Sequence, residues 1–185
     1  MSHSPLLEKH IQQLQKISRQ APILDLACGN GRNGLYLMQQ NIPLVFADVN
    51  ESALEHVKNA LTNYQLSDIK VPAEFWRVDF EQENITSLVD KSFSVIMVFR
   101  YLHRPLFEQI KAAIKPGGMI IYETFTEQQV QFGRPKNPDF LLKSAELAQL
   151  FSGWKIVHSF EGVVNTSVNG EAKQAIAQIV AIKPE

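Results

Sequence analysis

The chain has 185 residues, of which 45% are hydrophobic and 20% charged, and 18 Lys and Arg against 19 Asp and Glu leave a net charge of −1. This composition is typical of one globular domain and excludes a disordered chain, a collagen-like chain and a coiled coil. The even charge balance gives no overall attraction to nucleic acid or to an anionic membrane. The single cysteine, Cys28, cannot form an internal disulfide.

The apolar segments are short. The longest dense one, residues 93–99, falls far below the roughly 20 residues that span a bilayer. The N-terminus lacks the apolar run of a signal peptide. We therefore expect one cytoplasmic domain over residues 1–185, with neither a membrane nor a nucleic acid as partner.

The sequence of the first third of the chain predicts a helix, a strand, a helix, a strand and a helix, in this order. Residues 1–20 are predicted to form an N-terminal helix that Ser4 caps. The short apolar run ILDLA predicts a buried strand, which leads through CGNGRNG into a helix ending near Gln40. Residues 43–48 predict a second buried strand, and Asn50 is predicted to cap the next helix.

The alternation continues in the rest of the chain. Residues 73–80 predict a third strand, and residues 93–99, apolar on both faces, a fourth. The following helix is predicted to end at the turn 115–118, before a fifth strand over 119–125. Residues 126–143 are polar, contain two prolines and are predicted to be a lid loop. A short helix and two strands, expected to form an antiparallel hairpin, close the chain.

Alternating strands and helices indicate βαβ units with right-handed crossovers. We predict an α/β fold, three-layer and doubly wound (Rossmann-like). Its mostly parallel sheet should have seven strands and end in the C-terminal antiparallel hairpin. Ligands of such folds bind at the carboxyl ends of the strands, so functional residues are expected there.

A glycine-rich turn follows the first strand. Gly29, Gly31 and Gly34 have the spacing G-x-G-x-x-G, and Asp48 ends the next strand 19 residues after Gly29. Glycines let the backbone approach a ligand, helix N–H groups face it, and the carboxylate accepts from ribose hydroxyls. The pattern predicts a site for an adenosine-containing cofactor. The alternative is a packing turn with a solvated aspartate.

Asp25, inside the first strand, favours S-adenosylmethionine over NAD. A dinucleotide would bring its anionic pyrophosphate near this carboxylate, whereas S-adenosylmethionine carries a cationic ammonium and sulfonium. A chain of 185 residues also leaves no room for a separate dehydrogenase substrate domain. An NAD-linked reductase on the same turn and a non-catalytic cofactor-binding partner protein remain the alternatives.

Four segments resemble the successive motifs of class I S-adenosylmethionine-dependent methyltransferases: ILDLACGNGRNGLYL, FADVN, WRVDF and LFEQIKAAIKPGGMIIYETF. The resemblance covers about residues 20–125. DLACGNGRNGLYL is most similar to the tellurite-resistance and thiopurine methyltransferase branch, whose members take small substrates. Ala27 stands where the family more often has Gly, and we expect an extended backbone there that accommodates Ala. The resemblance implies methyl transfer to a small-molecule acceptor, with S-adenosylhomocysteine as product.

The resemblance also assigns cofactor contacts to the ends of successive strands. Asp25 would hold the methionine ammonium, and the backbone of Ala27, Gly29 and Gly31 would contact the methionine part. Asp48 would bind the ribose, with Val49 packed on the adenine. Asp79 would accept from the adenine amino group, Phe80 would flank the ring, and the Phe99 carbonyl would face the amino acid part.

Four residues are candidates for the acceptor site. Arg100 and His103 follow the fourth strand, and Glu123, a candidate base or arginine partner, lies in the fifth. Arg134 lies in the 126–143 loop, which Phe132 and Phe140 are predicted to anchor. We expect Arg100, His103 and Arg134 to line one pocket, which favours a small polar or anionic acceptor or a soft nucleophile. No Cys/His cluster indicates a metal.

Overall fold

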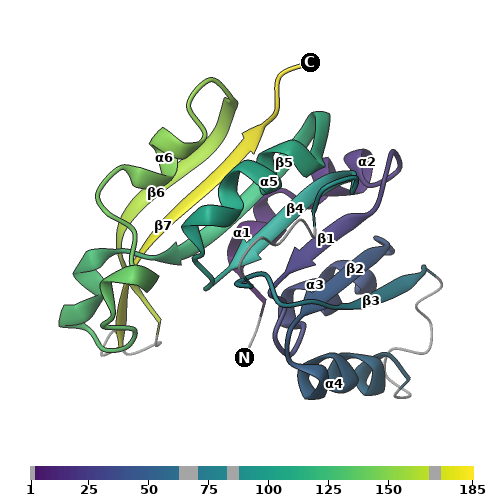
Figure 1. The fold of residues 1–185 in the computed structure, drawn as a ribbon, viewed down its shortest axis with the longest axis horizontal. Coiled ribbons are helices and arrows are strands. Elements are labelled where there is room, and N and C mark those ends of the chain that lie inside the picture. The colour runs from purple at the N-terminus through teal and green to yellow at the C-terminus, as the bar shows by residue number, and fades with distance from the viewer. Residues whose placement is uncertain (1–2, 63–70, 83–87, 167–171) are drawn as a thin grey trace.

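The computed structural model describes residues 3–62, 71–82, 88–166 and 172–185. Seven strands of this part form one sheet in the order β3-β2-β1-β4-β5-β7-β6 (Figure 1). The strands β1 to β5 are parallel, and β7 is antiparallel to both of its neighbours. This arrangement confirms the predicted fold and hairpin. The strands are β1 (Ile23–Leu26), β2 (Leu44–Asp48), β3 (Ala73–Arg77), β4 (Phe93–Phe99), β5 (Ile114–Phe125), β6 (Lys155–Asn165) and β7 (Lys173–Ile182).

Helices cover both faces of the sheet, and each face has its own apolar cluster. One cluster receives side chains of the first four helices, and the other those of α5 and α6. Every residue of β4 is buried between the two layers, as its continuous apolar sequence predicts. The helices are α1 (Pro5–Lys9), α2 (Ile11–Ile17), α3 (Arg32–Gln39), α4 (Glu51–Thr62), α5 (Phe107–Ala113) and α6 (Glu146–Leu150), with 3-10 turns η1 (Arg104–Leu106), η2 (Glu127–Gln131) and η3 (Pro138–Phe140).

The predicted caps are present, but the N-terminal helix is divided. Ser4 Oγ accepts from the backbone N–H of Leu6 at 3.3 Å. Asn50 Oδ1 likewise accepts from Ser52 at 3.0 Å. His10, with φ −115° and ψ 11°, leaves helical geometry and separates α1 from α2. The apolar spacing of this segment continues through the break, so it does not reveal it.

The segment 115–118 lies inside a strand, where the sequence predicts a turn. β5 already begins at Ile114, and its pairing with β4 shifts register between Phe93 and Val95. A Cβ on Gly118 would lie 2.7 Å from the Ser94 carbonyl oxygen, so glycine permits a close approach of the two backbones.

Residues 126–143 form an anchored segment. The buried Gln129 accepts from Ala175 N–H at 2.9 Å and donates to the Arg134 carbonyl at 3.1 Å. Thr126 forms a parallel bridge with Leu142. Phe132 and Phe140 are 37% and 48% exposed, so the prediction that they anchor the segment is wrong. The anchors are a buried amide and backbone hydrogen bonds, which apolar patterning does not reveal. A lid role for this segment stays a prediction.

Among the described helices, none combines the length and the apolar character needed to cross a membrane.

Candidate cofactor and acceptor site

The turn between β1 and α3 has an unusual backbone. Ala27, Gly29 and Gly31 have φ values of 54°, 52° and 70°, in the left-handed region. The expectation of an extended backbone at Ala27 is therefore wrong, because the Ala occupies a conformation that disfavours a Cβ. A Cβ at Gly31 would lie 2.5 Å from Val57 Cγ2, whereas nothing lies within 4 Å of one at Gly29. The turn thus packs on one side and leaves open space on the other.

Asp25 is buried under this turn, with 2% of its surface exposed. Its Oδ2 accepts from the backbone N–H of Gly34 at 3.1 Å. Burial raises the pKa of Asp25 to about 7, an effect that the Gly34 hydrogen bond and the charge of Arg32 only partly oppose. A buried carboxylate of this kind is stabilised by a cation brought next to it.

Asp48 closes the turn from the end of β2. Its Oδ2 accepts from Gly29 N–H at 2.8 Å, and its Oδ1 accepts from Asn50 N–H at 2.8 Å. This contact places the carboxylate beside the glycine turn, as the spacing of 19 residues predicts.

The residues expected around an adenine lie at the ends of β2 and β3. Val49 is 54% exposed, and the carboxylate of Asp79 accepts from Glu81 N–H at 2.9 Å. Phe80 is buried in the core against Trp76. The backbone joins the two segments, since Val78 N–H donates to the Asp48 carbonyl at 3.1 Å.

A cavity of about 750 Å³ opens beside the turn, and Asp25, Ala27, Gly29, Phe99 and Arg100 are among the residues that line it. Cys28 lines it too, and burial raises the pKa of its thiol far above the ordinary value. A thiol that stays protonated is a poor nucleophile, which agrees with Cys28 as a packing residue.

Arg100 brings a positive charge to this cavity in a strained backbone conformation, φ 60°. Its guanidinium stacks on Phe125, 4.4 Å from the ring centroid. Its Nη2 lies 3.2 Å from Glu123 Oε1, while its buried Nη1 has no hydrogen-bond partner among the described residues. Burial lowers the pKa of Arg100, and the charge of Glu123 opposes this shift.

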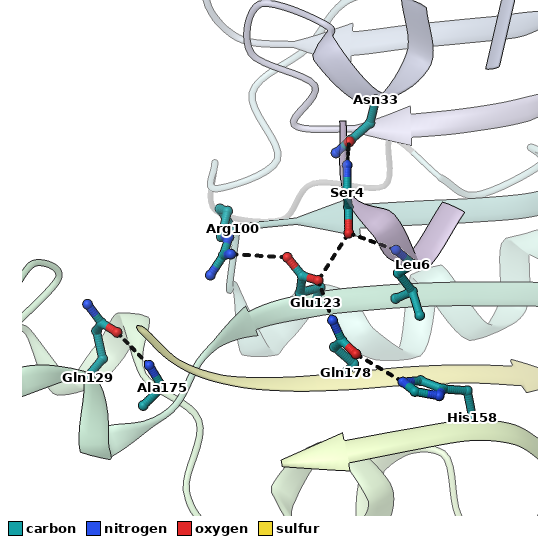
Figure 2. Close-up of polar contacts among 9 residues, drawn as sticks. All are labelled: Ser4, Leu6, Asn33, Arg100, Glu123, Gln129, His158, Ala175 and Gln178. Carbon is teal, nitrogen blue, oxygen red and sulfur yellow. Dashed lines mark hydrogen bonds and ion pairs between the residues drawn. The ribbon is translucent and has the colours of Figure 1, made fainter. Parts of the chain in front are cut away.

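Glu123 is the centre of a buried polar network (Figure 2). Its Oε2 accepts from Ser4 Oγ at 3.2 Å and from Gln178 Nε2 at 2.6 Å, and its Oε1 pairs with Arg100. Gln178 Oε1 in turn lies 2.9 Å from His158 Nε2. Both carboxylate oxygens are thus engaged, which is the arrangement of an arginine partner rather than of a free base.

The structure does not bring His103 and Arg134 to this cavity, contrary to the expected common pocket with Arg100. The His103 carbonyl accepts from Leu106 N–H at 3.1 Å, at the start of η1, and Arg134 is exposed. Arg104 instead donates to the Leu141 carbonyl at 2.8 Å and to Glu146 Oε1 at 2.7 Å, which ties the 138–142 segment to η1 and α6. None of the residues 126–143 lines the cavity.

Several residues at this site are not among the residues predicted for it. His3 and Tyr36 line the cavity, and Ser4 and Gln178 bond to Glu123. They lie in the N-terminal segment, on α3 and on β7, outside the motifs at the strand ends. The only available signal was the Ser4 cap, which indicates a helix start and nothing about a cavity.

The model of one protein family, described as tellurite resistance protein TehB, matches residues 5–177, nearly the whole chain. The chain belongs to the TehB family. This membership confirms the branch that the motif DLACGNGRNGLYL predicts. No curated protein matches the chain.

Solved structures agree with the TehB assignment in fold. TehB from Haemophilus influenzae is 20% identical with a TM-score of 0.69 over 93% of this chain, and this chain spans 62% of that one. An S-adenosylmethionine-dependent methyltransferase from Methanosarcina mazei is 18% identical with a TM-score of 0.69, and the match covers 100% of this chain and 99% of that one. The glycopeptide N-methyltransferase MtfA, solved with S-adenosylhomocysteine, is 13% identical with a TM-score of 0.66, covering 100% and 91%. These neighbours include S-adenosylmethionine-dependent methyltransferases, so the predicted methyltransferase-type fold is confirmed.

Proposed function

We propose that this protein transfers a methyl group from S-adenosylmethionine to a small anionic acceptor that attacks through a soft atom. Arg100 carries the proposal. Arg100 lines the cavity, its buried Nη1 has no hydrogen-bond partner among the described residues, and burying an unsatisfied charged donor is unfavourable unless a ligand completes it. An oxyanion or a carboxylate supplies the missing acceptor atoms. The tellurite named in the family description is such an oxyanion.

The residues beside the glycine turn fit the cofactor. A methionine ammonium next to Asp25 would stabilise the ionised carboxylate whose pKa burial raises. The open space at Gly29, flanked by the backbone of Ala27 and Gly31, suits the methionine chain. The half-buried carboxylate of Asp48 suits ribose hydroxyls, and Val49, Asp79 and Phe80 are the residues that we assign to the adenine. The Phe99 carbonyl, at the end of β4, would face the amino acid part.

The bound cofactor supplies an electrophilic methyl group on a sulfonium. In the transfer, a lone pair of the acceptor forms the new bond to the methyl carbon while the carbon–sulfur bond breaks and its electron pair stays on sulfur. Arg100 would hold the acceptor in line for this attack, a contribution of proximity. No proton has to leave the attacking atom of an anionic acceptor, so the engagement of both Glu123 oxygens is compatible with the reaction.

The test is methyl transfer from labelled S-adenosylmethionine to tellurite, selenite, a small anionic thiol and a neutral amine. We expect turnover with anions, and an Arg100→Gln variant that loses it, while the surface variant Arg77→Gln retains it. Arg77 is a suitable control because its ion pair with Glu51 is exposed. Turnover of the neutral amine alone would contradict the proposal.

Calorimetry with S-adenosylhomocysteine and with NAD addresses the two alternatives. Binding of NAD in preference would favour a reductase. Tight binding of S-adenosylhomocysteine without turnover of any acceptor would favour a non-catalytic binding protein.

A further inference from the structure

His3 lines the proposed cofactor cavity although it does not lie at the end of a strand. It lines the same cavity as Asp25, Gly29 and Arg100, although it belongs to the N-terminal segment before α1. Its ring stacks on Tyr36, with centroids 3.6 Å apart and an interplanar angle of 9°. Its Nε2 lies 2.6 Å from Glu8 Oε1. Two partners therefore hold this ring at the cavity wall.

The neighbouring Ser4 fixes the backbone of the segment. Ser4 is 2% exposed, its N–H donates to Asn33 Oδ1 at 2.9 Å, and its Oγ donates to Glu123 Oε2 at 3.2 Å (Figure 2). The other oxygen of the same carboxylate pairs with Arg100. Ser4 and Arg100 are thus separated by one carboxylate group, which places the N-terminal segment on the Arg100 side of the cavity.

The chemistry of the His3 ring suits an anion. Stacking on Tyr36 uses the ring face, and Glu8 occupies Nε2, so Nδ1 has no hydrogen-bond partner among the described residues. A histidine whose Nε2–H donates to a carboxylate can, when protonated, donate a second hydrogen bond from Nδ1. Arg100 lines the same cavity, and its buried Nη1 also lacks a hydrogen-bond partner within the described part of the chain.

We propose that His3 is a specificity-determining residue that contacts the anionic acceptor together with Arg100. The inference rests on the proposed function, because it assigns a second contact to the same acceptor. Two donors, one from the N-terminal segment and one from the end of β4, would select a compact anion with at least two acceptor atoms over a neutral molecule or an anion that accepts at one point only.

The experiment compares the full-length protein with His3→Ala and His3→Gln, using His10→Ala as a matched control. His10 follows the same short helix, but its ring is bonded to Gln13 and does not line the cavity. For His3→Ala we expect the KM for tellurite to rise roughly tenfold or more, the scale for losing a hydrogen bond to a charged group. We expect kcat and the Kd of S-adenosylhomocysteine to stay unchanged. His3→Gln, which keeps a donor, should be intermediate, and His10→Ala should match the wild type.

Unchanged KM in His3→Ala would overturn the inference, and so would an equal loss of S-adenosylhomocysteine affinity, which would make His3 a cofactor contact. A binding measurement separates this failure from failure of the proposed function. Selenite is titrated into the S-adenosylhomocysteine complex while the histidine ring resonances are followed by NMR. A shift of the His3 ring with no shift of His10 supports the contact even without turnover. No shift of His3, with or without turnover, rejects it.

Discussion

Arg100 and Glu123 are joined twice across the ends of β4 and β5. The backbone N–H of Arg100 donates to the Glu123 carbonyl at 2.8 Å, and the Arg100 guanidinium lies 3.2 Å from the Glu123 carboxylate. The backbone bond helps to hold Arg100 at φ 60°, and the ion pair restrains the guanidinium of this cavity-lining residue. Strained backbone of this kind persists where the surroundings over-determine it, as at functional sites.

Replacing Glu123 by Gln should lower both stability and acceptor affinity. The half-buried Arg100 would lose its counter-charge, and we expect the free energy of unfolding to fall by about 2 kcal/mol, below the range for fully buried pairs. The KM for an anionic acceptor should rise because the guanidinium is no longer oriented. Denaturant unfolding and steady-state kinetics measure the two effects. Glu74→Gln, at an exposed position of β3, is the control. Wild-type values for both quantities would show that Glu123 does not position Arg100.

Binding of S-adenosylhomocysteine should depend on pH through Asp25. The pKa of Asp25 is raised to about 7 in the free protein, and a bound ammonium favours the ionised carboxylate. Affinity should therefore rise with pH up to about 7 and then level off, with proton release on binding below that pH. Calorimetry in buffers of different ionisation enthalpy measures this release. Asp25→Asn should bind S-adenosylhomocysteine more weakly and lose this proton release.

The same shift predicts the effect of Asp25 on stability. The native state keeps the Asp25 proton up to about pH 7, whereas the ordinary pKa of 3.8 means that the unfolded chain loses it earlier. Between these values the unfolded state binds fewer protons, so Asp25 makes the free energy of unfolding fall as pH rises. Thermal unfolding of Asp25→Asn without ligand should show a smaller decline across this range. If the stability of both proteins falls equally as pH rises, a group other than Asp25 causes the decline.

Ala27→Gly should stabilise the protein. A left-handed Ala is unfavourable by roughly 1–2 kcal/mol, and the greater entropy of an unfolded glycine offsets roughly 0.5–1 kcal/mol of the gain. We expect a net increase of up to about 1 kcal/mol in the free energy of unfolding, measured with denaturant. Ala53→Gly, a buried helical position in α4, should instead lose stability. A loss at both positions would mean that the Ala27 methyl contributes packing that outweighs the strain.

Asp48→Ala should weaken S-adenosylhomocysteine binding by roughly 1.5–3 kcal/mol, the scale for charge-assisted hydrogen bonds. Asp48→Asn, which keeps an acceptor for Gly29 N–H, separates loss of ligand contact from loosening of the turn. Equal binding of S-adenosylhomocysteine to wild type and Asp48→Ala in calorimetry would remove the ribose role.

Hydrogen exchange tests the proposed lid. If residues 126–143 close over bound ligand, their exposed middle, around Phe132 and Arg134, should gain protection with S-adenosylhomocysteine. The anchor at Gln129 should be protected in both states because it is buried and bonded to Ala175. Equal protection throughout, with and without ligand, would make the segment an ordinary connection.

Features that depend on local physical chemistry could be predicted from the amino-acid sequence. Continuous apolar runs such as residues 93–99 predict buried parallel strands, and the glycines and Asp48 predict the turn at the end of β1. Parallel strands bring their carboxyl ends to one edge of the sheet. The sequence positions of Asp25, Asp48 and Arg100, in or after predicted strands, therefore predict that they share one site.

The surroundings of Arg100 depend on contacts between segments that are far apart in the sequence. Its partner Glu123 also bonds to Ser4, 119 residues away, and to Gln178, 55 residues away. No periodicity or local motif encodes such pairs, because they depend on how the N-terminal segment and β7 pack against β5. For the same reason, the sequence could not show that Arg134 lies outside the cavity. The prediction that it lines the cavity assumed that the loops after β4 and β5 meet there. The buried amide of Gln129 and the hydrogen bonds of Arg104 tie its segment down elsewhere, since satisfying buried polar groups decides where an irregular segment lies.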